Sequence, residues 1–131
     1  MEIPPQIQEL ATAYGVPGAR WLLALVFLYS GQDKLRHWRA SVEEVVELRL
    51  PFPAPFVAAT IATQLAGGAS VALGIGAPLG AAVLAAFTIT ATLLGHRFWL
   101  LHGAVARKEF TTALEHLAIV GGLLMVMVRF P

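Results

Sequence analysis

The feature that most constrains this chain is a long central stretch without any charged residue. Between Leu50 and Gly95 the sequence contains no Asp, Glu, Lys, Arg or His. A membrane-spanning helix needs about 20 consecutive apolar residues, so this stretch is long enough for two spans. The segment "GIGAP", Gly74 to Pro78, places helix-breaking residues near its middle and is the expected turn. Only 13% of all residues are charged, compared with about 25% in soluble domains, and we therefore predict an integral membrane protein.

Two further apolar segments would complete a four-helix arrangement. The uncharged run from Trp21 to Gln32 is only about 18 Å long as a helix, whereas the hydrocarbon core of a bilayer is about 30 Å thick. Arg20 and Lys34 border this run, and their side chains can carry the charge to the lipid headgroups while the stems stay in hydrocarbon. We predict spans at about residues 19–35, 56–75, 78–100 and 110–128. The short connections between them predict a single domain over residues 1–131, an all-α antiparallel four-helix membrane bundle.

The residues before the first span are expected to form a short helix on the membrane surface. Apolar residues recur there at helical spacing, at Ile7, Leu10, Ala11 and Tyr14. Gly15 and the Pro17–Gly18 pair should end this helix. Because it would be too short to cross a bilayer, we expect it to lie in the interface.

A second surface helix is expected between the first two spans, in "HWRASVEEVVELRLPFPAP". Ser41 with Glu44 fits a capping box at its start. Its apolar stripe consists of Val42, Val45 and Val46, with glutamates on the opposite side. The prolines at positions 51, 53 and 55 should end it.

Small residues indicate where helices approach one another closely in lipid. In the second span they recur every fourth residue, at Ala58, Ala62, Ala66, Ser70 and Gly74. Such a line lets two backbones come together, although an Ala-rich segment can also produce it by chance. Gly121 and Gly122 predict another close crossing in the fourth span. In the third span a polar stripe of Thr88, Thr92 and His96 should face protein rather than lipid.

Polar and titratable side chains gather at one end of the predicted bundle. The alternating helix directions bring the following residues there: His37, His96, His102, His116, Asp33, Lys34, Trp38, Trp99 and Glu115. Three interpretations are open. These residues form an interfacial rim, where Trp and basic side chains are common; they line a pocket for an amphipathic ligand such as a quinone; or His96 and His116 ligate haem or a metal. The third interpretation is the least supported, because no HxxxH or HxxE pair falls within one helix.

The candidate ligand-binding residues are Lys34, Gln64, His96, Trp99 and His116. Gln64, near the middle of the second span, is the deepest strongly polar side chain, and an interhelical hydrogen bond is its simpler role. Glu115 and His116 are expected in the first two turns of the fourth helix, where a carboxylate is favoured by the helix N-terminus. No set of residues has the spacing of a metal site.

Composition argues against several classes of function. A net charge of +1 and the lack of a basic run argue against nucleic-acid binding. The sequence contains no cysteine, which excludes thiol–disulfide chemistry, cysteine-ligated iron–sulfur clusters and covalently attached haem. The start "MEIPPQ" lacks the basic region of a signal peptide, so we expect the N-terminus to be mature.

Several segments, in order, resemble the DoxX family of small bacterial four-helix membrane proteins. The segments are "LALVFLYSGQDKL", "QLAGGASVALGIGAPLGA", "TATLLGHRFW" and "LEHLAIVGGLL", and the resemblance runs from Arg20 to Leu124. The family's usual "sG..Kl" falls on Ser30, Gly31, Lys34 and Leu35, and its "h.fw" element falls on His96, Phe98 and Trp99. Many members have Glu in place of Gln64 and Asn in place of His116. If that Glu handles protons in relatives, Gln64 cannot do so here.

The resemblance implies membership in a membrane oxidoreductase system. Relatives are described as a small subunit of a thiosulfate:quinone oxidoreductase and as membrane partners of redox-defence enzymes. We therefore expect an accessory or anchoring subunit of a quinone-linked oxidoreductase complex in the bacterial inner membrane. Its expected partners are other oxidoreductase subunits and lipids, with no intrinsically bound cofactor and a quinone as the candidate ligand. The alternatives are a stand-alone carrier or permease for a small hydrophobic compound and a purely structural subunit of a larger complex.

The distribution of basic residues predicts the orientation. Seven of the nine Lys and Arg residues lie at the end that contains the first and third connections: Lys34, Arg36, Arg39, Arg49, Arg97, Arg107 and Lys108. Only Arg20 and Arg129 lie at the other end, so the positive-inside rule places these connections in the cytoplasm and both termini outside. A C-terminal reporter that is active only in the cytoplasm should stay silent. A strong signal would reverse the orientation without affecting the four-helix prediction.

Overall fold

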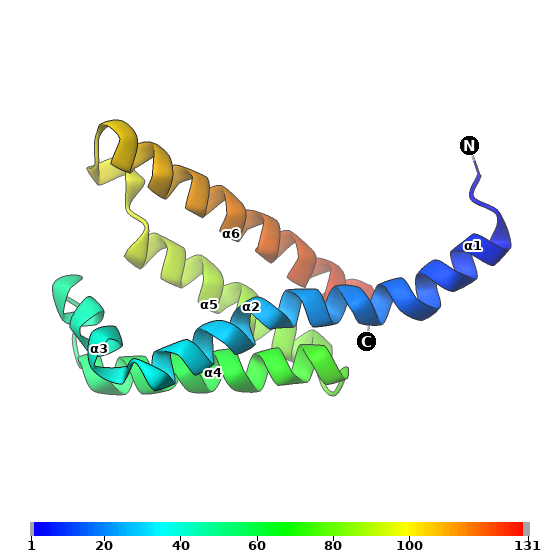
Figure 1. The fold of residues 1–131 in the computed structure, drawn as a ribbon, viewed down its shortest axis with the longest axis horizontal. Coiled ribbons are helices and arrows are strands. Elements are labelled where there is room, and N and C mark those ends of the chain that lie inside the picture. The colour runs from blue at the N-terminus through cyan, green and yellow to red at the C-terminus, as the bar shows by residue number, and fades with distance from the viewer. Residues whose placement is uncertain (1, 130–131) are drawn as a thin grey trace.

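The computed structural model describes residues 2–129, and every regular element in that range is helical. The elements are α1 (Pro5–Leu10), the π-helical turn η1 (Ala11–Gly15), α2 (Val16–Arg36), α3 (Trp38–Glu47), α4 (Pro53–Leu73), α5 (Ala77–Gly95), the 3-10 turn η2 (Phe98–Leu100) and α6 (Gly103–Arg129). Within residues 2–129, four helices are long and apolar enough to cross a membrane. In Figure 1, α2, α4, α5 and α6 run alternately in opposite directions, and α3 lies at one end of the α2–α4 pair. The predicted all-α four-helix membrane fold is confirmed.

The first spanning helix is longer than predicted. The chain is continuously helical over 32 residues, from Pro5 to Arg36, which corresponds to about 48 Å. The prediction that Gly15 and Pro17–Gly18 end a separate surface helix is therefore wrong. Pro17 stands in the first turn of α2, where its fixed φ and missing N–H are tolerated, and the wider π turn η1 precedes it. Because a helix of this length exceeds the roughly 30 Å hydrocarbon core, its α1 end extends past the other helices (Figure 1).

The surface helix α3 starts earlier than predicted and has no capping box. Ser41 lies inside α3, where its Oγ donates to the carbonyl oxygen of His37 at 2.9 Å, and no side chain caps the helix start. Of the predicted apolar stripe, Val45 is buried against α4 while Val46 is exposed. The hydroxyl bonds its own helix because a serine one turn into a helix can reach the carbonyl four residues back.

α3 ends before all three prolines, and two of them open the next helix. α3 ends at Glu47, and the chain then turns through Arg49 and Phe52, which both have positive φ. Pro53 and Pro55 follow in the first turn of α4, where no intrahelical N–H donor is needed.

The connection between α5 and α6 also differs from the prediction. α5 ends at Gly95, so His96 is its C-cap residue and Trp99 lies on η2. α6 begins at Gly103 rather than near Phe110. His116 therefore lies near the middle of α6 and not within its first two turns, so the helix N-terminus does not explain its position.

The spanning helices form two pairs that meet at one end and diverge at the other. α2 packs along α4, α5 packs along α6, and a tight turn with left-handed Gly74 and Gly76 joins α4 to α5. Near that turn both pairs share one buried cluster, whose members are Ala24, Phe27, Val71, Ala72, Ala77, Ala81, Leu84, Ala85, Val120, Leu123 and Val126. Towards α3 and η2 the α5–α6 pair separates from the α2–α4 pair (Figure 1). We call these two regions the closed end and the open end of the bundle.

Glycines permit the close approach of helices at the closed end. A Cβ atom on Gly67 would lie 2.8 Å from the Cγ of Leu84, and one on Gly80 would lie 2.9 Å from the Cβ of Ser70. These distances are shorter than ordinary van der Waals contact, so α4 and α5 touch where only glycine fits. Gly68 and Gly122 face α2 in the same way, at Leu28 and Leu23.

The predicted line of small residues does not mark these contacts within the chain. Ala58, Ala62 and Ala66 are exposed. Ser70 does meet α5, whereas Gly74 is the left-handed C-cap residue of α4, with φ of 71°. A Cβ atom on Gly121 would meet no neighbouring atom within 4 Å, so Gly122 alone makes the crossing predicted for this pair. Because α4 is rich in small residues all round, spacing alone does not show which line faces another helix.

The packing of α4 against α5 can be tested with two neighbouring substitutions. Gly67→Leu should destabilise the bundle by about 1–3 kcal/mol, since overfilling a packed contact forces side chains and backbone to shift. Ala66→Leu is the matched control, because Ala66 is exposed and a larger side chain there meets no other helix. Thermal unfolding in a mild detergent would measure both. Equal loss of stability in the two variants would contradict the packing described.

Candidate functional site

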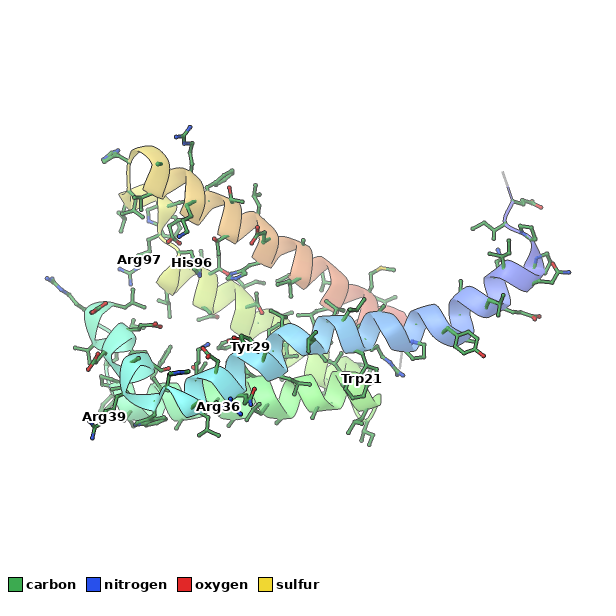
Figure 2. All side chains as sticks on the ribbon, viewed as in Figure 1. Trp21, Tyr29, Arg36, Arg39, His96 and Arg97 are labelled. Atoms are coloured by element: carbon green, nitrogen blue, oxygen red, sulfur yellow. The ribbon has the colours of Figure 1, made fainter. Side chains whose placement is uncertain are left out.

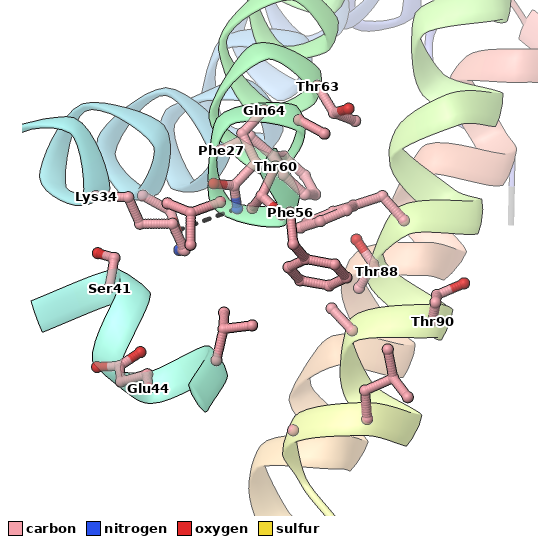
Figure 3. Close-up of a pocket in the computed structure, with 18 of the residues that line it drawn as sticks. Phe27, Lys34, Ser41, Glu44, Phe56, Thr60, Thr63, Gln64, Thr88 and Thr90 are labelled. Carbon is pink, nitrogen blue, oxygen red and sulfur yellow. Dashed lines mark hydrogen bonds between the residues drawn. The ribbon is translucent and has the colours of Figure 1, made fainter. Parts of the chain in front are cut away.

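A cavity of about 640 Å³ lies at the open end, between the α2–α4 pair with α3 and the α5–α6 pair. Figure 3 shows α3 and α4 on one side of it and α5 on the other. Apolar side chains dominate its lining, among them Phe27, Val45, Phe56, Phe87, Leu94 and Ile119. A few polar groups enter from both sides. A mainly apolar cavity with a small number of convergent polar groups is the usual form of a site for an organic ligand.

The α2–α4 side of the cavity carries a cationic group. Lys34 Nζ donates to Ser30 Oγ, one turn earlier on α2, at 2.6 Å. Gln64 Nε2 of α4 donates to the same oxygen at 3.1 Å. The expectation that Lys34 extends its charge to the headgroups is therefore wrong, because the side chain turns back along α2 towards the bundle interior (Figure 3). We call Ser30, Lys34 and Gln64 the cationic wall.

No carboxylate forms a salt bridge with Lys34 in the described part of the chain. Glu44 of α3 lines the same cavity, and Glu44 and Asp33 attract the ammonium group from beyond salt-bridge distance. The three donors of the Lys34 ammonium group are thus met by a single hydroxyl oxygen among residues 2–129. Such a group can still bind an acceptor in the cavity.

Gln64 leaves one polar atom without a protein partner. The residue is 5% exposed, and its Oε1 has no hydrogen bond among the residues that the structure describes. Leaving a buried acceptor unsatisfied costs about 1–3 kcal/mol. Because Gln64 lines the cavity, a hydroxyl group of a ligand or a water molecule can supply the missing donor. The interhelical hydrogen bond expected for Gln64 is present, so this side chain joins two helices and faces the cavity as well.

The opposite side of the cavity carries two imidazoles. His96, at the end of α5, and His116, on α6, both line it, and their ring centroids are 5.0 Å apart. His96 Nδ1 pairs with Glu109 Oε2 at 2.5 Å, and His116 Nδ1 pairs with Thr92 Oγ1 at 2.8 Å. Figure 2 shows His96 between the end of α5 and α6. We call His96, Glu109, His116 and Thr92 the imidazole wall.

Four of the five candidate residues named from the sequence line this cavity, namely Lys34, Gln64, His96 and His116. Trp99 does not: it is 51% exposed on η2 and stacks edge-on against Phe98. His37 and His102 are exposed and also lie outside the cavity lining. All four histidines lie at or near the open end, as the sequence predicts, but only His96 and His116 line the cavity.

The arrangement of acidic and imidazole groups does not form a metal centre. Among residues 2–129, no group of three His, Cys, Asp or Glu side chains could hold a metal ion. His96 and Glu109 pair with each other, and the ring of His116 turns towards a threonine. The geometry fits hydrogen bonding better than ligation.

Sequence reasoning missed two residues that organise the site. Ser30 entered only as part of a family pattern, because a serine next to a span has no individual signal for a hydrogen-bonding role. Glu109 directly precedes the predicted start of the fourth span and was not considered, since that helix was expected to begin after it. Its spacing from His96 crosses a turn, so no helical periodicity connects the two.

These features define a multi-pass all-α membrane protein with a cavity between a cationic wall and an imidazole wall. The DoxX family model matches residues 15–97, more than half of the chain, and the protein belongs to the DoxX family. The match includes α2 to α5, and hence Lys34, Gln64 and His96, and it ends before α6. Comparison with curated proteins and with solved structures gave no match.

The role of Ser30 can be tested through stability. Ser30→Ala should destabilise the protein by about 1–3 kcal/mol, because it removes the shared acceptor of a buried amide and an ammonium group. Ser41→Ala is the matched control, since Ser41 also lines the cavity but bonds only a carbonyl of its own helix. Thermal unfolding in detergent should show a clear loss for the first variant and almost none for the second. Similar values for both would mean that Ser30 does not hold the cationic wall together.

Proposed function

We propose that this DoxX-family protein is an accessory subunit of a quinone-linked oxidoreductase complex in the bacterial inner membrane, and that its cavity is part of a quinone site. The observation that carries the proposal is the cationic wall, an inward-turned ammonium group beside an amide in an otherwise apolar cavity. Quinones combine an apolar ring with two carbonyl oxygens, so they need an apolar cavity with hydrogen-bond donors at its sides. The cavity volume falls within the roughly 300–1,000 Å³ typical of small-molecule sites.

The cationic wall matches both redox forms of such a ligand. The Lys34 ammonium group can donate to a quinone carbonyl oxygen. The unpartnered Oε1 of Gln64 can accept from the hydroxyl group that replaces that carbonyl in the quinol. The aromatic rings of Phe27, Phe56 and Phe87 provide the apolar lining between the walls. A partner subunit would carry out electron transfer, in keeping with the roles described for proteins that this sequence resembles.

A binding experiment tests the quinone site directly. Lys34→Met should lower the affinity for a short-chain ubiquinone about five- to 150-fold, because a lost donor leaves a ligand oxygen unpaired at a cost of about 1–3 kcal/mol. Arg36→Met is the matched control, since Arg36 is exposed at the same end of α2 and does not line the cavity. Quenching of tryptophan fluorescence by the quinone in lipid nanodiscs would measure the dissociation constants. Equal affinity of wild type and both variants would refute the quinone site.

The accessory role has a separate test. After purification in a mild detergent, mass spectrometry should identify redox subunits in stoichiometric amounts. A lone homo-oligomer would instead favour a stand-alone carrier, and a large complex without redox subunits would favour a structural role. Each of these results leaves the quinone-binding measurement valid.

A further inference from the structure

The imidazole wall forms a connected row of polar groups between the edge of the bundle and the cavity. Glu109 pairs with His96, the ring of His96 meets the ring of His116 edge-on with an interplanar angle of 77°, and His116 pairs with Thr92. Thr92 Oγ1 in turn lies 2.7 Å from the carbonyl oxygen of Thr88, on the same helix. The row thus joins α5 to α6 across the open end.

The two ends of this row have different surroundings. The side chain of Glu109 is 27% exposed and that of His96 is 31% exposed. The exposed Arg107 and Lys108 precede Glu109 on α6, and such basic side chains gather where a bundle meets interfacial water. Both imidazoles line the cavity, whereas Glu109 does not. The row therefore leads from solvent at the edge of the bundle to the place where a ligand would bind.

The charged groups around the row come from several elements. Arg97 directs its Nε to the carbonyl oxygen of Leu94, and Arg107 and Lys108 on α6 are exposed. Glu115, next to His116 in the sequence, is exposed and acts on His116 electrostatically. Lys34 faces the cavity from the opposite wall. Glu109 is thus the one carboxylate in the described chain that pairs with an imidazole of the cavity.

We propose that the imidazole wall is the proton route of the quinone site, with His96 and His116 as proton donors and Glu109 as a positioning residue. This inference rests on the proposed function. Reduction of a quinone takes up two electrons, from the flavin or metal centre of a partner subunit, and two protons. The electrons reduce the ring. One proton passes from water through the imidazoles to the ring oxygen that faces them, the Lys34 ammonium group gives the second to the oxygen that it binds, and two O–H bonds form. Lys34 then takes up a proton from water. The carboxylate of Glu109 holds the His96 ring in the orientation for transfer, and its negative charge lies beside the positive charge that the ring carries during transfer.

A structural role is the simpler explanation for the same contacts, because the His96–Glu109 pair also fastens the end of α5 to α6. The two explanations differ in what a conservative variant does. Glu109→Gln keeps the side-chain size and a hydrogen bond to His96 but removes the negative charge. If the pair only fastens helices, quinone reduction will be unaffected by this change.

The test uses the full-length protein in lipid nanodiscs loaded with decylubiquinone. An electrode and a soluble mediator supply the electrons, and a pH-indicator dye follows proton uptake. We expect Glu109→Gln to slow proton-coupled reduction of the bound quinone at least about tenfold, since general acid–base groups typically contribute factors of 10² or more. The dissociation constant of the quinone should stay unchanged. Redox-induced infrared difference spectra should show imidazole bands in the wild type that are altered in Glu109→Gln.

Two matched controls and the binding data separate the outcomes. Glu43→Gln, an exposed carboxylate on α3 outside the cavity lining, and His102→Gln, an exposed histidine, should both behave as wild type in rate and infrared spectrum. Wild-type rates and spectra in a Glu109→Gln protein that still binds quinone would overturn the proton route and leave the quinone site intact. Failure of the wild type to bind decylubiquinone would overturn both proposals.

Discussion

The close contact of α4 with its two neighbours is the constraint on which the rest of this structure depends. In lipid there is no hydrophobic driving force for apolar helices to associate, so tight packing and hydrogen bonds decide which helices pair. At the closed end, Gly67 and Gly80 bring α4 and α5 into direct contact, and Gly68 does the same for α4 and α2. These contacts fix the helices where the α4–α5 turn holds them together. The cavity follows from the divergence of the two pairs away from this point (Figure 1).

The polar residues of the bundle form two groups, which differ in whether all their hydrogen-bonding atoms have partners. Thr88 and Ser41 are buried, and each hydroxyl lies in hydrogen-bond range of a carbonyl oxygen of its own helix. The hydrogen-bonding needs of these hydroxyl groups are met within one helix, so they do not indicate a ligand. Gln64 instead bonds a side chain of the neighbouring helix α2, Lys34 bonds a side chain one turn earlier on α2, and both keep unused hydrogen-bonding capacity at the cavity. In a membrane, where water cannot satisfy polar groups, unused capacity is costly, and a cavity is where it can be used.

The sequence was sufficient for the number and approximate position of the spanning helices, because hydropathy and length alone determine what can cross a bilayer. It was not sufficient to predict where each helix begins and ends. Gly15 and Pro17 were predicted to end a helix. The helix continues because Gly15 lies in a π turn and Pro17 stands in the first turn of α2. The fourth helix was predicted to start near Phe110, and this placed His116 at a helix start and excluded Glu109 from consideration.

The sequence identified the rare polar residues of the candidate site but not their hydrogen-bond partners. Charged and amide groups in an apolar chain are rare, so Lys34, Gln64, His96 and His116 could be recognised individually. Their partners could not, because Ser30 and Glu109 are ordinary residues whose role depends on which helix faces lie together. The same limit applies to the small residues of α4. Ala66 and Gly67 are adjacent and equally small, and only the arrangement of the neighbouring helices shows that one is exposed and the other packed against Leu84.

The two walls of the cavity belong to different helix pairs, and this determines how ligand binding would affect the stability of the bundle. The cationic wall lies within the α2–α4 pair: the Lys34–Ser30 bond stays within α2, and the Gln64–Ser30 bond joins α4 to α2. The imidazole wall lies within the α5–α6 pair, and its hydrogen bonds likewise stay inside that pair. No described hydrogen bond or salt bridge joins one wall to the other, so their separation is set by packing at the closed end. A ligand that contacts both walls would therefore add the interaction between the pairs that the open end lacks, and binding there would stabilise the bundle as a whole.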